Sequence, residues 1–302
     1  MADSHPTDSG IVIDSRYRLI APLGTGSGSQ VYLADDIRLR RQVAVRVLRR
    51  THVDDPSFLE EFRSEAQKAT NLNHPNLIPI YDWGEQELPY VVTEYLSGGN
   101  LRNLVDTAGN LSSSQALLIG IEIAKGLEYA HKRGVTHLSL KPTNILFDFE
   151  SNIRIAGFGI SKTLASFSSA NTETPGDQHY LSPEQIKGRR IDQRSDVYSL
   201  SCLLYESVAG NQSSEQLQDV GDVEPLSDRI ESNLELSGSL APPLKQASSE
   251  DLNERPNAGE FLQLLTNAAS SQSRPDPLPV STGLGREKPI SLRDDPILID
   301  LA

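Results

Sequence analysis

Residues 137–146 read HLSLKPTNIL, and three further segments follow them: IAGFGIS at 155–161, YLSPEQ at 180–185 and RSDVYSL at 194–200. Three shorter segments come before them: LGTGSGSQV at 23–31, VAVRVL at 43–48 and RSEAQ at 63–67. A glycine-rich turn such as the first of these is common in unrelated proteins and decides little by itself. Seven segments in one order and spacing carry much more information, so the series as a whole decides the fold.

The elements expected around these segments change along the chain. Before residue 99, stretches such as YRLIAPLG, SQVYLADD and QVAVRVLR cluster or alternate β-branched residues between turn signals, which predicts strands. One helix interrupts them, because Asp55 can cap a helix that runs to about residue 69. Beyond residue 99, two helices are predicted over 112–134 and 195–210, each ending at a glycine. A β-rich part followed by an α-rich part predicts an α+β chain with two lobes.

The order and spacing of the seven segments resemble the signature set of the protein kinases. Phrases such as LNHPNLIPIYD are typical of the bacterial Hanks-type serine/threonine kinases. The resemblance implies a bilobal protein-kinase-like fold, with a β-rich N-lobe over 17–97 and a mainly helical C-lobe over 98–268. Residues 1–16 are polar and are expected to form a flexible N-terminus. Residues 269–302 are rich in proline and charge without regular period, which predicts a disordered tail or linker.

Composition restricts the partners and the compartment. The 302 residues carry a net charge of −13, which argues against nucleic acid or an anionic membrane as the main partner. Eleven acids and three bases lie between residues 211 and 262; a solvated face is the preferred interpretation, and a docking surface for a basic partner is the alternative. The single cysteine, the absence of an N-terminal signal and the absence of a long apolar run predict a cytoplasmic chain without a membrane span.

The resemblance also implies a nucleotide site. Gly24, Gly26 and Gly28 can bring backbone N–H groups close to phosphates, because no Cβ obstructs the approach. The other residues that the resemblance places around the nucleotide are Val31, Ala44, Arg46, Glu94, Leu96 and Leu146. Simple core packing is the alternative explanation for Ala44 and Leu146.

Three positions that carry the chemistry of the family hold different residues here. The lysine that pairs with phosphates and with a helix glutamate is Arg46, whereas the glutamate is retained as Glu65, so an Arg46–Glu65 ion pair is expected. The aspartate that accepts the substrate proton is Ser139, which cannot act as a general base without an activator of its own. The aspartate that binds Mg²⁺ is Gly157, which offers no side-chain oxygen, so no metal site is expected.

Many other positions of the family pattern are retained. Lys141 and Asn144 match later positions of the catalytic loop. The resemblance implies a stack of His137 on Phe158, a tie from Asp196 to the catalytic-loop backbone, and a buried Glu184–Arg255 ion pair.

One further change accompanies the loss of the aspartate at position 139. Family members carry a threonine where this chain has Asp177, and that position lies against the loop lysine. We therefore expect an ion pair between Asp177 and Lys141 that replaces a catalytic hydrogen-bond network. A relocated general base is the alternative.

These substitutions predict a pseudokinase that acts as a scaffold or allosteric partner in phospho-signalling, with residual ATP binding that does not need Mg²⁺. The alternatives are a nucleotide sensor and a weakly active, atypical ATP-dependent Ser/Thr kinase. The expected partners are proteins, either an active kinase or a phospho-binding domain that binds the activation segment, residues 160–183. The candidate acceptors in that segment are Ser161, Thr163, Ser166, Ser168, Ser169, Thr172 and Thr174.

Overall fold

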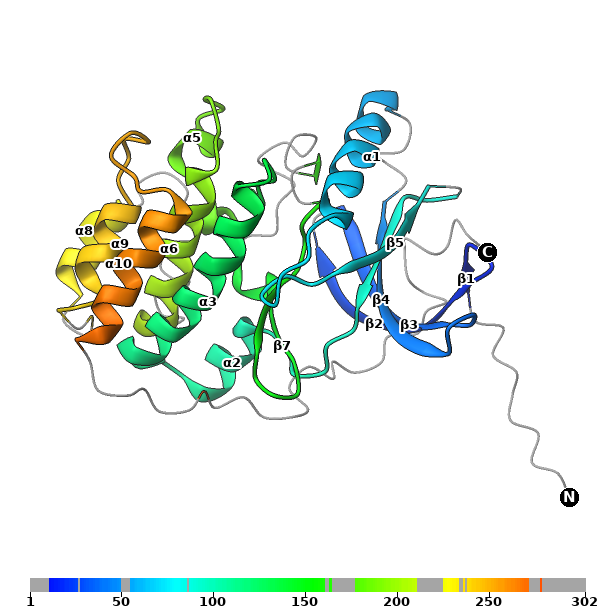
Figure 1. Ribbon diagram of the computed structural model, residues 1–302, viewed down its shortest axis with the longest axis horizontal. Helices are drawn as coiled ribbons and strands as arrows, with labels where there is room; N and C mark the ends of the chain where they lie inside the picture. The colour runs from blue at the N-terminus through cyan, green and yellow to red at the C-terminus, as the bar shows by residue number, and fades with distance from the viewer. Residues whose placement is uncertain are drawn as a thin grey trace, which may run out of the picture. The chain divides into compact units, whose positions relative to one another are not determined.

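The computed structural model describes residues 11–26, 28–49, 55–85, 87–160, 163–164, 177–210, 225–233, 236, 238–271 and 278. These residues form two compact units (Figure 1). Among the described residues, the sheet unit comprises those within 11–59 and 80–95, and the helical unit comprises those within 60–79 and 96–278. The predicted lobe boundary at residue 97 is close to this division. The difference is the helix predicted from Asp55, most of which belongs to the helical unit.

The sheet unit is a six-stranded antiparallel sheet in the order β1-β2-β3-β4-β6-β5. Its strands are β1 (Val12–Ile13), β2 (Tyr17–Gly26), β3 (Ser29–Asp36), β4 (Arg41–Leu48), β5 (Ile80–Gly84) and β6 (Tyr90–Glu94). The predicted strand segments are confirmed. β1 lies within the residues expected to form a flexible N-terminus, and it pairs with β2 through Val12↔Arg18 and Ile13↔Tyr17. A two-residue strand has no alternation long enough to be recognised in the sequence.

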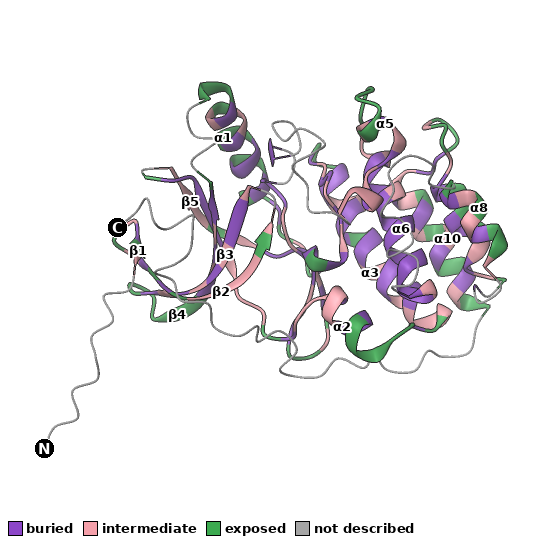
Figure 2. Cartoon of the chain, turned by 180° about the vertical axis from the view of Figure 1, so that it is seen from behind, coloured by how far each residue is buried: buried purple, intermediate pink, exposed green. Residues whose placement is uncertain are grey.

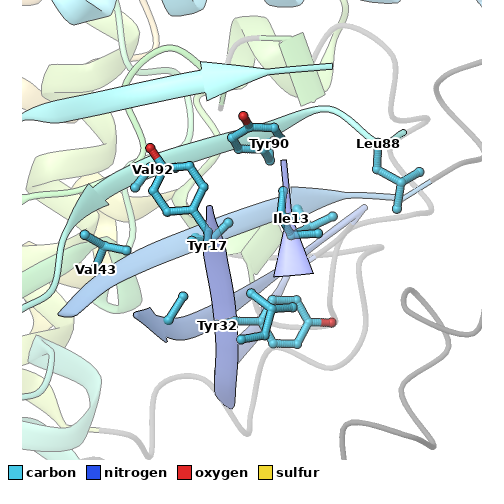
Figure 3. Packing of buried hydrophobic residues seen from close by; sticks show 11 residues of the cluster. Ile13, Tyr17, Tyr32, Val43, Leu88, Tyr90 and Val92 are labelled. Carbon is cyan, nitrogen blue, oxygen red and sulfur yellow. The ribbon is translucent and has the colours of Figure 1, made fainter. Parts of the chain in front are cut away.

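The alternation of β4 separates the two faces of the sheet. Val43 and Val45 are fully buried, whereas Arg46 points to the opposite face, as the two-residue period of a strand requires. Figure 3 shows the cluster that the buried face joins, with contributions from β1, β2, β3, β4 and β6. Tyr17 and Tyr90 meet edge-on in this cluster, with their ring centroids 6.0 Å apart.

The remaining elements belong to the helical unit, except that the first residues of α1 belong to the sheet unit. They are α1 (Pro56–Thr70), α2 (Leu101–Ala108), α3 (Ser113–His131), η2 (Pro142–Asn144), β7 (Ile145–Phe147), β8 (Ile153–Ile155), η3 (Asp177–Tyr180), α5 (Pro183–Ile186), α6 (Arg194–Ala209), α8 (Leu226–Ser232), α9 (Ala241–Ala247) and α10 (Ala258–Ser270). No described helix is long and apolar enough to cross a membrane.

α3 packs against α6 and α10, and α6 is buried along nearly its whole length (Figure 2). The close approach of α3 to α6 depends on Gly120, because a Cβ there would lie 2.7 Å from Leu204. α6 ends at Ala209 and is capped by Gly210, the glycine predicted to terminate it, which has a φ of 76°. α3 ends at His131, three residues before the predicted Gly134, which instead closes the following turn with a φ of 72°.

α10 continues to Ser270, slightly beyond the predicted domain end at residue 268. The rest of the expected tail lies outside the described residues, apart from Ser271 and Leu278. So do most of the predicted acceptors of the activation segment, with the exception of Thr163, which is buried.

Candidate functional site

Asp196 of α6 binds the backbone of the catalytic loop, residues 137–144. Its carboxylate is fully buried and accepts hydrogen bonds from the backbone N–H groups of His137 at 2.8 Å and Leu138 at 2.6 Å. His131 lies 2.7 Å from the same carboxylate through its Nε2. Burial opposes ionisation of Asp196, but the hydrogen bond and charge of His131 outweigh it, so the pKa of this carboxyl lies below its usual value. The predicted tie between Asp196 and the loop is confirmed.

The two N–H groups converge on one carboxylate because Leu138 adopts a left-handed conformation with a φ of 58°. Such a conformation is uncommon for a residue with a Cβ and persists only where the surrounding contacts enforce it. Gln185 of α5 adds one such contact, since its Nε2 donates to the Leu138 carbonyl at 2.9 Å. Gln185 was not among the predicted site residues.

Side chains of the loop hydrogen-bond to backbone groups within the same unit. His137 Nδ1 accepts from the N–H of Ser139 at 3.2 Å, so its Nε2 carries the proton and donates to the Ala156 carbonyl at 2.8 Å. Asn144 Nδ2 donates to the Ser139 carbonyl at 2.9 Å, and the Asn144 carbonyl accepts from Ala156 N–H at 2.8 Å. The loop therefore holds its shape with a serine at position 139.

The segment Gly157-Phe158-Gly159 follows β8. Phe158 meets His137 edge-on, with ring centroids 4.8 Å apart and an interplanar angle of 85°, which confirms the predicted stack. Gly157 has a φ of 104° and Gly159 a φ of 84°, both in the region that favours glycine. A Cβ at Gly159 would lie 2.7 Å from the Cβ of Ala69, so α1 packs directly on this segment.

Lys141 and Asp177 form the predicted ion pair. The Nζ of Lys141 lies 2.6 Å from Oδ2 of Asp177, and the two side chains are 16% and 21% exposed. Asp177 begins η3, so the pair joins the catalytic loop to the end of the activation segment. Since both charged groups are largely removed from solvent, their attraction is screened less than that of a surface pair.

Two buried ion-pair networks hold the segment that follows η3. Glu184 accepts two hydrogen bonds from Arg255, at 2.7 Å and 3.0 Å, and one from Ser195 at 2.6 Å. Burial opposes the ionisation of Glu184, but these donors outweigh it and lower the pKa of the carboxyl. The predicted Glu184–Arg255 pair is confirmed.

The second network was not predicted. Arg102 of α2 contacts Glu206 of α6 at 2.8 Å and donates to the Tyr180 hydroxyl at 2.8 Å, and that hydroxyl also bonds to Glu206. The YLSPEQ segment is thus anchored at both ends, by Tyr180 and by Glu184.

Several predicted nucleotide residues lie together on one face of the sheet unit. Val31 of β3 pairs with Arg46 of β4 and with Gly24 of β2, and Ala44 lies two residues from Arg46 on the same face. The guanidinium of Arg46 donates to Ser29 Oγ at 3.3 Å, and burial lowers the pKa of Arg46 to about 10.

The remaining nucleotide candidates are distributed along the chain. Gly26 lies in β2, Gly28 follows it with a φ of 78°, and Glu94 ends β6. Leu96 and Leu146 belong to the helical unit, where Leu146 of β7 pairs with Arg154. A pocket formed by all of these residues would combine the two units, and it stays a prediction.

The expected Arg46–Glu65 ion pair also stays a prediction, because Arg46 belongs to the sheet unit and Glu65 to the helical unit. Within the helical unit, Glu65 is buried on α1 and pairs with Lys68 at 2.9 Å. Among the residues that the structure describes, no group of three His, Cys, Asp or Glu side chains is placed to hold a metal ion.

The fold and the catalytic-loop geometry agree with the comparison to protein families. Residues 17–272 match the protein kinase domain, so the chain belongs to the protein kinase family. It is 44% identical over 206 residues to the serine/threonine-protein kinase PknB of Mycobacterium leprae, and 40% identical over 200 residues to the serine/threonine-protein kinase PrkC of Bacillus subtilis. Within the family, it is a serine/threonine protein kinase domain of the bacterial Hanks type.

The extent of these matches is limited. Each covers 66% of this chain but only 33% of PknB and 31% of PrkC, so the chain corresponds to about a third of the length of these relatives. Solved structures support the fold. A crystal structure of the kinase domain of Mycobacterium tuberculosis PknI, as a double mutant, superposes with a TM-score of 0.70 at 24% identity, covering 89% of this chain and 100% of that domain.

Proposed function

We propose that this kinase domain is a pseudokinase, which keeps the fold and the loop scaffold without transferring phosphate. The observation that carries the proposal is the state of the catalytic loop. Its backbone is held by Asp196, yet position 139 has a serine in place of a proton acceptor, and Gly157 has no oxygen for Mg²⁺. General-base catalysis alone contributes about 10²–10⁴ in rate, and loss of metal stabilisation adds to that.

The Lys141–Asp177 ion pair supports the same proposal. In phosphoryl transfer, a cationic side chain near the transferred group helps to stabilise developing negative charge. Here the Lys141 ammonium lies 2.6 Å from a carboxylate of its own chain. That contact also weakens the alternative in which Asp177 serves as a relocated base, because the carboxylate already accepts a hydrogen bond from Lys141 of its own chain.

The proposed role is that of a scaffold or allosteric partner in bacterial phospho-signalling. The proposed partner is an active kinase, or a phospho-binding domain that binds the activation segment. The names of the relatives, which are serine/threonine-protein kinases, support a partner that takes part in protein phosphorylation. We propose cytoplasmic location for this domain and binding of ATP that does not need Mg²⁺. The face that carries Val31, Ala44 and Arg46 supports the nucleotide part.

The test is a phosphorylation assay with labelled ATP on the full chain, with its own activation segment and a generic basic protein as acceptors. No transfer above background is expected with Mg²⁺ or Mn²⁺. The matched control is A44W, which fills the predicted adenine site. Metal-dependent transfer that A44W abolishes would overturn the proposal in favour of an atypical kinase. Transfer that A44W leaves unchanged would indicate a contaminating kinase.

A further inference from the structure

The end of α5 and the residues that follow it form a basic turn in the helical unit. Residues 186–191 read IKGRRI, and all six are exposed, as the green segment beside α5 shows in Figure 2. Ile186 is 59% exposed and Ile191 is 41% exposed, so the three bases lie between two isoleucines that face solvent. Exposed apolar side chains that gather in one place, with polar groups around them, are typical of an interaction site, whereas single scattered ones are not.

The backbone of the basic turn is held on both sides. The N–H of Arg189 donates to the carbonyl of Glu184 at 2.8 Å, and the carboxylate of Glu184 is itself bound by the buried Arg255 at 2.7 Å and 3.0 Å. After the turn, Asp192 pairs with Arg194 at 2.7 Å, where α6 begins. The turn is therefore preorganised, which lowers the conformational entropy lost when a ligand binds.

The positive charge of the basic turn is not neutralised within the described part of the chain. Among the described residues, Arg189 and Arg190 make no ion pair and no side-chain hydrogen bond. Lys187 contacts Glu250 at 3.5 Å, but the two side chains are 46% and 62% exposed, so that pair is weak and a ligand can displace it. The chain as a whole carries a net charge of −13, so this turn is a local concentration of positive charge on an acidic protein.

A phosphate group matches two neighbouring arginines better than a carboxylate does. Phosphoserine and phosphothreonine carry about two negative charges on one group, with three acceptor oxygens. The planar guanidinium donates pairs of hydrogen bonds to such oxygens. A carboxylate brings a single charge and would leave one of the two guanidinium groups unmatched. Phosphorylated serine and threonine are also the products of serine/threonine kinases, the group to which this chain belongs.

We propose that the basic turn binds a segment of a partner protein that is phosphorylated on serine or threonine. Arg189 and Arg190 bind the phosphate, and Lys187 adds a third positive charge. Ile186 and Ile191 contact apolar side chains that flank the phosphorylated residue. The inference rests on the proposed function, which it deepens by naming the chemistry through which this domain recognises a partner in phospho-signalling. The step is binding alone, and no group is transferred.

The test is fluorescence anisotropy on the full chain without ATP, with a labelled peptide of the sequence GSAVpTLASG, in which pT is phosphothreonine. The phosphopeptide should bind at least about ten times more tightly than the same peptide with threonine or glutamate at that position, since one charge-assisted hydrogen bond is worth about tenfold or more. R189E/R190E should lose at least about tenfold in affinity for the same reason. The matched control is K132E/R133E, which reverses two exposed bases just after α3 and should keep the wild-type affinity.

Two further variants check the fold and the apolar contacts. R189E/R190E should unfold at the same urea concentration as the wild type, because neither arginine makes a side-chain contact in the described part of the chain. I186S/I191S should weaken binding of the phosphopeptide by about fivefold, because less apolar surface is then removed from water.

Several outcomes would overturn the proposal. Equal affinity for the phosphopeptide and the threonine peptide would show that phosphate is not recognised, and equal affinity for the glutamate peptide would assign the turn to an acidic segment. Equal losses in R189E/R190E and K132E/R133E would show unspecific attraction, and unchanged binding by I186S/I191S would contradict the apolar contacts. A wild type that sediments as a dimer, with R189E/R190E as a monomer, would assign the turn to a second copy. Because the assay contains no ATP, its failure leaves the pseudokinase proposal untouched, and phosphate transfer by the chain would leave the binding result untouched.

Discussion

Two charged residues beside the catalytic loop differ in whether they keep the partner that the family pattern gives them: Asp196 does, and Lys141 does not. Asp196 keeps its contacts to the loop backbone, and the loop keeps its shape although Ser139 stands at the position of the proton acceptor. Lys141 has instead a new partner, Asp177. A charge in a partly buried position without a partner costs several kcal/mol, so the loss of a carboxylate at position 139 favours the gain of one nearby.

Some of these contacts could be predicted from the sequence and others could not. The Lys141–Asp177 and Glu184–Arg255 pairs were predicted, because the family resemblance places their positions together. The contact of Arg102 with Glu206 joins residues 104 apart and leaves no periodic trace in the sequence. The donation from Gln185 to a backbone carbonyl depends on the unusual φ of Leu138, which composition does not reveal.

The first prediction concerns the coupling within the Lys141–Asp177 pair. A double-mutant cycle with K141M, D177N and the double variant, measured by urea unfolding, should give a coupling free energy of about 1 kcal/mol. Exposed pairs contribute about 0–1 kcal/mol, and this pair is mostly shielded from solvent. The matched control is the exposed pair Lys132–Glu128, where K132M and E128Q should be additive. Additivity within about 0.3–0.5 kcal/mol at Lys141 and Asp177 would show that the two residues do not interact.

The second prediction concerns pH and Asp196. Its carboxyl has a lowered pKa in the folded chain, so below about pH 4 the unfolded chain binds the proton more readily than the folded chain. Its contribution is complete above the unfolded pKa and is lost as pH falls through the folded one. The free energy of unfolding of D196N should therefore fall less steeply between pH 5 and 3 than that of the wild type.

Urea unfolding at each pH measures this slope. D35N, which alters an exposed pair with Arg18, serves as the control and should keep the wild-type slope. Glu184 also has a lowered pKa, so part of the acid dependence should remain in D196N. Parallel curves for D196N and the wild type would contradict the assignment.

At the scale of elements, α1 illustrates what periodicity can and cannot predict. Its existence and its start after Asp55 follow from a cap and from apolar spacing, and both are confirmed. Its division between the two units does not follow, because it depends on packing with Gly159, about 90 residues later in the chain. Periodicity also does not predict the last residue of a helix. α3 ends at His131, although Gly134 has the positive φ expected of a terminating glycine.

The third prediction tests the packing of α1 on Gly159. G159A adds a Cβ 2.7 Å from the Cβ of Ala69 at a φ of 84°. The control, G134A, adds a Cβ at a φ of 72° with no atom within 4 Å. Both variants lose about 1 kcal/mol or more from the left-handed conformation, and G159A should lose a further 1–3 kcal/mol or so from the clash. Equal losses in thermal or urea unfolding would show that α1 does not restrict this position.

At the scale of the whole molecule, the fold class and the family were predictable, and the nucleotide pocket that the family resemblance implies stays a prediction. Seven short segments suffice for the fold because each lies at a fixed place in the element order. The predicted nucleotide residues are divided between the sheet unit and the helical unit. Their joint action depends on contacts that no local pattern encodes, so ligand binding has to be measured on the complete chain.

The last prediction is that ATP stabilises the chain equally with Mg²⁺ and with a chelator. A ligand at ten times its dissociation constant stabilises the folded state by about 1.4 kcal/mol, which a thermal-shift assay detects. Metal should add nothing, because Gly157 has no side-chain oxygen and the amide oxygen of Asn144 supplies no carboxylate, the ligand that Mg²⁺ needs beside phosphate oxygens. G157D should lose stability, since a φ of 104° lies far from the value of about 57° that suits a residue with a Cβ, and it should gain a shift that depends on Mg²⁺. A44W should remove the ATP shift from both chains. A wild-type shift that grows sharply with Mg²⁺ would show that another carboxylate binds the metal, and no shift at all would refute ATP binding and leave the scaffold role alone.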